Sequence, residues 1–406
     1  MTTQRNPIDS LRLGQWFKLI CGASYQDVSR IQNLALVYSL AGADCIDVAA
    51  DPAVVHAALG GIAISQSICP SRLGKRPWLM VSFNDGQDPH FRKAWFDSQR
   101  CPIDCSRPCE RICPASAIPP RVPETKGSGA KEPGAKEPGA RGLEASPDRH
   151  LGVIAERCYG CGRCLPACPH NLIEEHSFTV AVKAIAPTLF PHIDAIEIHT
   201  QIGRQAEFQR LWRQLTPYIS QLKLVSVSCP DSEPHSSAVV DYLTQLYRLM
   251  VPKPNQLLWQ TDGRPMSGDL GRGTTHATIC LAQKVLNACL PGYVQLAGGT
   301  NDYTVAKLRS QNLLQTEHLS IPGSSRHEQR SISGVAYGSY ARRLVNLEID
   351  RIEEQPEQLW QQVSLARALV GQIKPNIHHS WHDAAIPESD NPPNCFERTS
   401  AAIVPP

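Results

Sequence analysis

Short apolar runs alternate with longer segments of helical periodicity along most of the chain. In the first helical segment, Val28, Ile31, Leu34, Ala35 and Tyr38 fall on one face. The apolar runs predict strands at Trp16–Ile20, Asp44–Ala49, Trp78–Phe83, Asp194–His199, Leu222–Ser228, Leu257–Thr261, Tyr293–Ala297 and Ile332–Ala336. The periodic segments predict helices at Tyr25–Ala41, Thr179–Leu189, Ala206–Ile219, Val239–Met250, Thr274–Leu290, Asn301–Arg309 and Gln355–Val370. A further helix is predicted to begin at Pro52, with Asp51 as its N-cap residue.

Strands that alternate with helices in this way predict a parallel sheet with right-handed crossovers. Eight strands favour an α/β fold of the (β/α)8-barrel class, with a doubly wound open sheet as the alternative. The alternation is interrupted after the third strand, between residues 94 and 175. We therefore expect a barrel-like domain from residues 1–93 and 176–372, with a ferredoxin-like insertion that leaves from the carboxyl ends of the strands.

The insertion carries eight cysteines in two runs, each followed by proline. The second run has the spacing C-x2-C-x2-C-x3-C-P of a bacterial ferredoxin and consists of Cys158, Cys161, Cys164 and Cys168. Gly160 and Gly162 leave room for the backbone to pass close to a cluster. The first run departs from the standard form, because three residues separate each of Cys101, Cys105, Cys109 and Cys113.

In two-cluster ferredoxins the last cysteine of each run ligates the other cluster. This rule assigns one 4Fe-4S cluster to Cys158, Cys161, Cys164 and Cys113. It assigns a second cluster, either 4Fe-4S or 3Fe-4S because of the looser spacing, to Cys101, Cys105, Cys109 and Cys168. A disulfide knot or a zinc site is the alternative, but two proline-terminated runs suit iron and sulfide better.

Two segments of the chain are predicted to be disordered. Residues 119–146 lie between the cysteine runs and contain AKEPG twice, a composition that cannot bury a core. We expect a low-complexity loop there. Residues 373–406 are rich in proline, histidine, serine and aspartate, and we expect a disordered tail.

The composition narrows the class of protein. The chain has 406 residues, 42% of them hydrophobic, which is ordinary for a globular core. Its 40 basic and 38 acidic residues form no basic block, which argues against a nucleic-acid partner. No apolar stretch is long enough for a transmembrane segment. Fifteen cysteines without a signal peptide indicate a reducing, cytoplasmic location.

Other candidate residues lie near the carboxyl ends of the predicted strands. Glycine-rich segments that suit a phosphate or a flavin tail are found at Asp262–His276, Gly298–Thr300 and Gly334–Arg342. Plain packing is the alternative for them. Asp47, Glu197 and His199 are candidates for acid–base chemistry, although such residues in strands are more often satisfied polar groups.

Seven cysteines lie outside the two runs. Five of them are expected to be small buried apolar residues: Cys21, Cys45, Cys229, Cys280 and Cys289. Cys69 and Cys395 lie in predicted loops and receive no assignment.

Four stretches together resemble the cyanobacterial light-dependent period family, LdpA: WFKLICGASYQDV, LALVYSLAGADCIDVAADPAVV, CPIDCSRPCERICPASAI and CYGCGRCLPACPHNLIE. The resemblance extends to about Val370. It implies an iron–sulfur protein of the circadian clock input pathway, which senses cellular redox state linked to photosynthetic electron flow. It implies KaiA and the histidine kinases CikA and SasA as associated proteins, and the eight cysteines named above as cluster ligands.

Two functional hypotheses follow. A redox sensor would use the clusters to shift a conformation or the affinity of a partner. A barrel oxidoreductase would pass electrons from the clusters to a flavin or a small substrate. No clear base or nucleophile is present and no G-x-G-x-x-G motif follows a strand, so the sensor is preferred and no catalytic residue is assigned.

Overall fold

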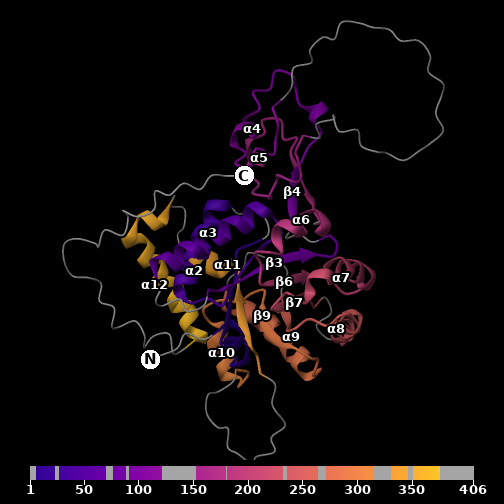
Figure 1. Cartoon of the computed structure of the whole chain (residues 1–406), viewed down its shortest axis with the longest axis vertical. Helices are drawn as coiled ribbons and strands as arrows, with labels where there is room; N and C mark the ends of the chain where they lie inside the picture. Colours follow the sequence, from indigo (N-terminus) through magenta and orange to yellow (C-terminus); the bar gives the residue numbers. More distant parts are fainter. Residues whose placement is uncertain are drawn as a thin grey trace, which may run out of the picture.

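Eight parallel strands close into a barrel in the computed structural model (Figure 1). The model describes residues 6–22, 27–69, 76–87, 91–120, 152–179, 181–231, 236–263, 271–314, 331–345 and 351–374. The barrel strands are β1 (Trp16–Ile20), β2 (Cys45–Ala49), β3 (Trp78–Asn84), β6 (Ala195–His199), β7 (Leu224–Pro230), β8 (Leu257–Asp262), β9 (Tyr293–Ala297) and β10 (Gly334–Tyr337). Their order around the barrel is β1-β10-β9-β8-β7-β6-β3-β2. The predicted (β/α)8 class is therefore confirmed, and the open-sheet alternative is wrong.

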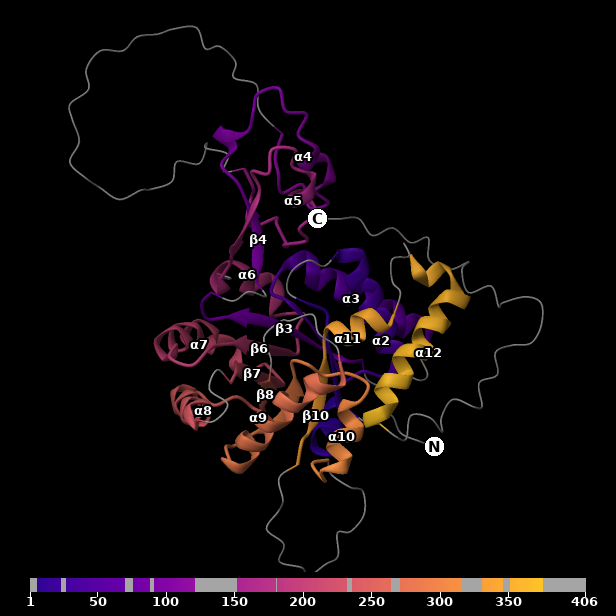
Figure 2. The same cartoon turned by 180° about the vertical axis from the view of Figure 1, so that it is seen from behind.

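Helices surround the barrel, as Figure 2 shows from behind. They are α2 (Val28–Ala41), α3 (Pro52–Ile68), α6 (Val182–Leu189), α7 (Gln205–Ile219), α8 (Ala238–Leu249), α9 (Thr275–Asn287), α10 (Thr304–Ser310), α11 (Ser339–Leu344) and α12 (Pro356–Ile373), with short 3-10 turns η2 (Arg272–Thr274) and η3 (Ile352–Glu354). The predicted cap of α3 is confirmed, because the Asp51 carboxylate accepts a hydrogen bond from Ala53 N at 3.0 Å. Gly42 ends α2 with a left-handed φ of 96°.

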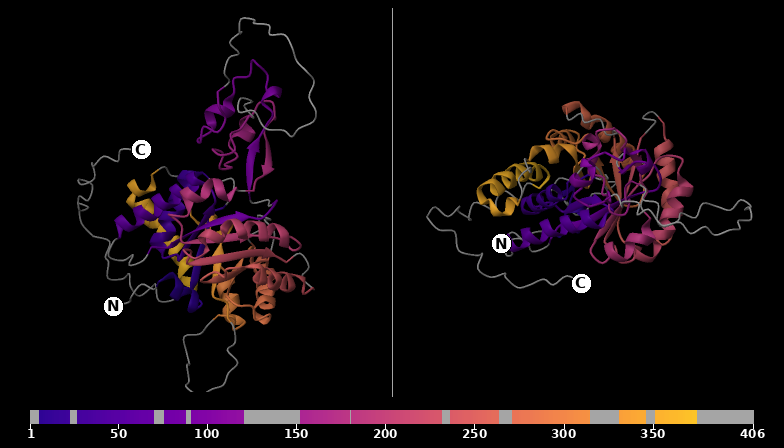
Figure 3. Two further views of the ribbon diagram at one scale, coloured as in Figure 1. Left: turned by 45° about the vertical axis from the view of Figure 1, so that its right-hand side comes forward. Right: turned by 90° about the horizontal axis from the view of Figure 1, so that it is seen from above.

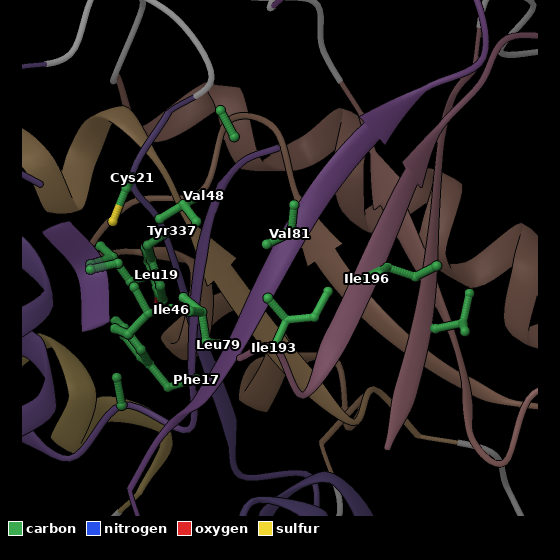
Figure 4. Close-up of a cluster of buried hydrophobic side chains, with 14 of the residues drawn as sticks. Phe17, Leu19, Cys21, Ile46, Val48, Leu79, Val81, Ile193, Ile196 and Tyr337 are labelled. Carbon is green, nitrogen blue, oxygen red and sulfur yellow. The ribbon is translucent and has the colours of Figure 1, made fainter. Parts of the chain in front are cut away.

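The main hydrophobic core lies between the outer face of the barrel and its helices. Phe17 and Leu19 of β1 point to this side together with Ile46 of β2 (Figure 4). The Phe17 ring stacks on Tyr337 of β10 at 5.1 Å and on Tyr38 of α2 at 5.9 Å. Because side chains alternate along a strand, the residues between these positions face the barrel interior.

A short helix that the sequence analysis did not predict contributes to the amino-terminal end of the barrel. This helix, α1 (Pro7–Arg12), carries Leu11, which is fully buried. Leu11 belongs to a second apolar cluster with Trp16, Trp78 and Met80. The helix has only six residues, too few to show helical periodicity in the sequence.

The insert leaves the barrel between β3 and β6, which pair directly with each other. It consists of β4 (Arg92–Trp95), the 3-10 turn η1 (Ser98–Arg100), α4 (Pro108–Ile112), α5 (Cys164–Ala167) and β5 (Glu174–Ser177). The strands β4 and β5 form an antiparallel ribbon in which Ala94 faces Glu175. In Figure 3, left, the insert projects from one end of the barrel, and this ribbon runs between them. The ribbon was not predicted, because its residues show no alternation of apolar and polar positions.

Two predictions lie wholly or mostly outside the described residues. These are the low-complexity loop from residue 121 onward and the tail beyond Lys374. Among the helices that the structure describes, none has the length and apolar character that a membrane crossing requires.

Candidate functional site

Four cysteine side chains line one hollow in the insert. Cys158, Cys161 and Cys164 come from the second run, and Cys113 comes from the first. Burial, together with the sulfurs of Cys158, Cys161 and Cys113, raises the pKa of the Cys164 thiol to about 12. Four thiolates in this space would repel one another, and cationic iron would relieve that repulsion. The donor set therefore fits an iron–sulfur cluster.

The cysteines of the described ranges are available as thiolate ligands. Within the described ranges, no three cysteine, histidine or acidic side chains are grouped closely enough to hold one metal ion. The fourteen cysteines in those ranges are all free thiols. The four sulfurs thus stand around a hollow, as an inorganic iron–sulfide core requires.

The backbone of the second run has the conformation that its glycines allow. Gly160 has a φ of 80° and Gly162 a φ of 74°, both in the left-handed region. Helix α5 then begins at Cys164 and places this residue in its first turn. The chain can therefore bring three cysteines to the same hollow within seven residues.

The other predicted ligand set is brought together only in part. Cys109 and Cys168 are buried in the insert's apolar cluster, and Cys101 packs against it. Burial raises the pKa of Cys109, Arg107 opposes this, and the sulfurs of Cys168 and Cys101 add to it. Cys105 is half-buried and, among the residues that the structure describes, does not belong to this apolar cluster.

The two cysteine runs end in matching structures. Ala117 N donates to Cys113 Sγ at 3.2 Å, and Leu172 N donates to Cys168 Sγ at 3.4 Å. Each donor lies four positions after its cysteine. The residue just before each donor has a left-handed φ, which is 47° at Ser116 and 50° at Asn171. Backbone amides that donate to sulfur stabilise a thiolate and help set a cluster's potential. The repeated sequence CPxxxI could have predicted this pair.

The insert is fixed to the carboxyl end of the barrel by polar contacts around Lys93. Lys93 Nζ donates to Ala155 O at 2.6 Å, lies 3.8 Å from Asp51 Oδ2, and lies over the Phe178 ring at 4.1 Å from its centre. Asn84, the last residue of β3, donates from Nδ2 to Phe178 O at 2.9 Å. The predicted position of the insert above the strand ends is therefore confirmed.

Comparison with known proteins gives the family. Residues 101–179 match the model of the LdpA Fe-S cluster-binding domain, and residues 190–372 match that of the light dependent period A C-terminal domain. A Synechococcus elongatus protein named light dependent period A is 46% identical over 376 residues, which cover 91% of this chain and 94% of that relative. The chain belongs to the light dependent period A family. Both cysteine runs lie within the matched iron–sulfur domain.

Solved structures give only weak likenesses to this light dependent period A family member. A Mycobacterium tuberculosis tryptophan synthase has a TM-score of 0.39 and 11% identity, with 91% of this chain and 97% of that chain covered. A truncated 3-deoxy-D-arabino-heptulosonate 7-phosphate synthase from Thermotoga maritima has a TM-score of 0.36 and 10% identity, with 90% and 88% covered. No conclusion about chemistry follows from likenesses at this level.

In this member of the light dependent period A family, a network of polar side chains fills the middle of the barrel. Lys18 Nζ lies 2.5 Å from Glu197 Oε2 and 3.0 Å from Asp47 Oδ2. Ser82 Oγ donates to Asp47 at 2.7 Å, and Gln260 Nε2 donates to Glu197 at 2.7 Å. Burial by itself would lower the pKa of Lys18, but the two carboxylates outweigh it and raise that pKa. The amine is therefore held in its charged form.

This network accounts for the acid–base candidates. Asp47 and Glu197 are buried within it, and His199 Nε2 lies 3.1 Å from Glu197 Oε1 at its upper edge. Their contacts are those of satisfied polar groups. Lys18 was missed by the sequence analysis, although a lysine at an inward position between Trp16 and Ile20 is the signal that could have found it.

Close packing explains glycines in the candidate phosphate segments. A Cβ at Gly263 would lie 2.1 Å from Thr278 N, and one at Gly299 would lie 2.6 Å from Thr274 O. Arg342, at the end of the last segment, donates to Ile20 O at 2.8 Å. Residues 264–270 lie outside the described ranges.

The remaining cysteines follow the prediction only in part. Cys21, Cys45 and Cys229 are buried, as expected. Cys280 is half-buried and Cys289 is exposed, so the prediction is wrong for these two. Helix α9 ends at Asn287, so Cys289 follows it in a left-handed turn with φ 53° instead of lying in the helix. The unassigned Cys69 is half-buried, and Cys395 lies outside the described residues.

Proposed function

We propose that this chain is a redox sensor that passes the cellular redox state, set by photosynthetic electron flow, to the circadian clock. The observation that carries the proposal is the hollow lined by Cys113, Cys158, Cys161 and Cys164 in a region that matches an iron–sulfur cluster-binding domain. We propose a cytoplasmic site of action, with KaiA, CikA and SasA as partners. The insert, residues 94–175, is the proposed sensing domain.

Two clusters are proposed. One 4Fe-4S cluster is held by Cys113, Cys158, Cys161 and Cys164. The other, 4Fe-4S or 3Fe-4S, is held by Cys101, Cys105, Cys109 and Cys168. An iron–sulfur cluster supplies reversible one-electron chemistry when it is bound.

The chain's own residues hold the thiolates and shape their surroundings. The amides of Ala117 and Leu172 donate to the sulfurs of Cys113 and Cys168, which favours the thiolate form. Apolar side chains around Cys109 and Cys168 limit access of water to those sulfurs. Such a site can change charge by one electron without turnover, which is what a sensor needs.

The oxidoreductase alternative has less support. The middle layer of the barrel is filled by Lys18, Glu197 and their hydrogen-bond partners, and packing explains Gly263 and Gly299. Arg342, in the last of the candidate segments, is used in a hydrogen bond to Ile20 O. The sensor is therefore preferred.

Full-length protein purified without oxygen tests the proposal. We expect a brown protein with iron, acid-labile sulfide and EPR signals on reduction. Cys161→Ser with Cys164→Ser should remove most iron from one cluster, whereas Cys280→Ser with Cys289→Ser should leave the iron count unchanged. Colourless protein without acid-labile sulfide would contradict the proposal, and a yellow fluorescent cofactor released by heat would favour the oxidoreductase. Capture of purified KaiA or CikA in a redox-dependent manner would support the clock role.

A further inference from the structure

The wall of the four-cysteine hollow that faces the barrel is formed by Tyr159 and Arg163. Tyr159 lines the hollow and also belongs to the main hydrophobic core of the barrel, with 6% of its surface exposed. Cys161 packs against the same core. Two residues that line the hollow therefore also pack against the core of the barrel.

Arg163 joins the hollow to helix α2 of the barrel. Arg163 is one of the residues that line the hollow, and its guanidinium forms an ion pair with the carboxylate of Asp27. Arg163 therefore connects the four-cysteine hollow with the first residue before α2.

Asp27 occupies the N-cap position of α2 but does not cap it. Its backbone is extended, with φ −91° and ψ 143°, as an N-cap residue requires. Within the described part of the chain, its carboxylate accepts no capping hydrogen bond from the first turn of α2. Asp51, at the same position of α3, accepts such a bond from Ala53 N at 3.0 Å. The Asp27 carboxylate is used by Arg163 instead.

We infer that Arg163 is shared between the cluster site and Asp27, and that this sharing carries the redox state of the site to α2. One electron from a low-potential one-electron carrier of the ferredoxin class adds a negative charge beside Arg163, and no bond is formed or broken. The guanidinium is then drawn toward the hollow, and the Asp27 carboxylate is released to cap α2. An exposed ion pair and an N-cap are of similar strength, so one added charge is enough to exchange them.

The position of α2 gives this exchange a route into the barrel. The helix packs against α3 and α12, and Tyr38 Oη at its other end donates to Ala341 O at 2.8 Å. A capped first turn would order the amino-terminal end of a helix that is otherwise buried in the core. The inference rests on the proposed function, because it requires a redox-active cluster held by Cys113 and the second run.

Hydrogen exchange of the full-length, iron-loaded protein tests the inference. The probes are the amides of Ser29 and Arg30, which a capping carboxylate would bind. In the wild type, we expect exchange at these amides to be about fivefold slower after reduction with dithionite than in the oxidised protein. Asp27→Ala should give fast exchange in both states. Asp27→Asn, which caps without attracting Arg163, should give slow exchange in both.

The arginine is tested in the same way and by redox titration followed by EPR. Arg163→Gln should give slow exchange in both states, because Asp27 is then free, and should lower the midpoint potential. Arg163→Lys should restore both properties in part, because it keeps the charge. The control is Arg210→Gln on α7, which removes an arginine from an exposed pair with Glu207 and should change neither property.

The outcomes separate the inference from the proposed function. A wild type that binds no iron or sulfide would overturn the proposed function itself. A loaded, reducible wild type whose Ser29 and Arg30 amides exchange equally fast in both states would overturn only the inference. Redox-dependent exchange that persists in Asp27→Ala would do the same. If Arg163→Gln fails to load iron, the two Asp27 variants, which lie outside the hollow, still decide the matter.

Discussion

Lys18 Nζ and Glu197 Oε2 lie 2.5 Å apart in the closed interior of the barrel, where neither side chain has any exposed surface. Asp47 completes the group at 3.0 Å from the same ammonium. Two carboxylates therefore share one cation, and neighbouring side chains satisfy their remaining oxygens. In this environment each charge depends on the others, because water cannot replace a lost partner.

Lys18→Met should destabilise the barrel strongly. It leaves Glu197 and Asp47 buried without their cation, and we expect the free energy of unfolding to fall by about 3–5 kcal/mol in a urea titration. Lys223→Met is the control, because Lys223 also pairs with an aspartate, Asp194, but is half exposed. Its effect should stay within about 1 kcal/mol. Equal effects of the two substitutions would show that the buried group carries no special weight.

Ionisation of Asp85 should make the folded protein less stable as the pH rises. Burial raises its pKa to about 6, although Thr200 and Arg204 oppose the rise. The folded protein thus holds a proton that the unfolded chain, with an ordinary aspartate pKa, releases between about pH 4 and pH 6. The ionised carboxylate therefore destabilises the fold above pH 6, and the penalty disappears as pH falls through this range.

Replacement of this carboxyl measures the effect. Asp85→Asn should raise the free energy of unfolding by up to about 2–3 kcal/mol at pH 8, with a gain that shrinks steadily toward pH 4. Urea titrations of both proteins at several pH values give the comparison. A gain that is the same at every pH would mean that ionisation of Asp85 is not its source.

Gly152 should tolerate a side chain less well than Gly203. Both have positive φ values, 29° and 94°. A Cβ at Gly152 would lie 2.3 Å from Phe96 O, whereas nothing lies within 4 Å of one at Gly203. Gly203→Ala should therefore cost only the backbone strain, about 1–2 kcal/mol. Gly152→Ala should cost more and should also lower the iron content, because Phe96 belongs to the insert's apolar cluster.

The two cysteine runs should exchange their last ligands. Cys113→Ser is expected to weaken the same EPR signal as Cys161→Ser, because both side chains line one hollow. Cys168→Ser is expected to weaken the same signal as Cys109→Ser, because both side chains are buried in the insert's apolar cluster and the Cys168 sulfur raises the pKa of Cys109. If Cys113→Ser instead matched Cys109→Ser, each run would hold its own cluster and the proposed ligand sets would be wrong.

The barrel was predictable because its strands are short apolar runs that differ from the periodic helices around them. The amide donors to the cysteines and the ion pair of Arg163 were not, because they depend on contacts between distant segments. Lys18 shows the limit most clearly: a charge inside an apolar run has meaning only when Glu197, 179 residues later, is known to lie beside it.

The candidate site, like the fold, was predictable from the sequence only in part. The rule for ferredoxin-type runs paired Cys113 with the second run, and the structure brings these sulfurs to one hollow. The same rule says nothing about Tyr159, Arg163 or Asp27. Their roles arise from how the insert is seated on the barrel, which no spacing within the insert encodes.

The two ends of the insert lie side by side in the antiparallel ribbon of β4 and β5, where Arg92 faces Ser177. A module with adjoining ends can be cut out and the gap closed by a short turn, with β3 and β6 still side by side. The same module can be grafted into a hairpin of an unrelated scaffold. A new host would have to supply carboxylates for Lys93 and Arg163, as Asp51 and Asp27 do in this chain.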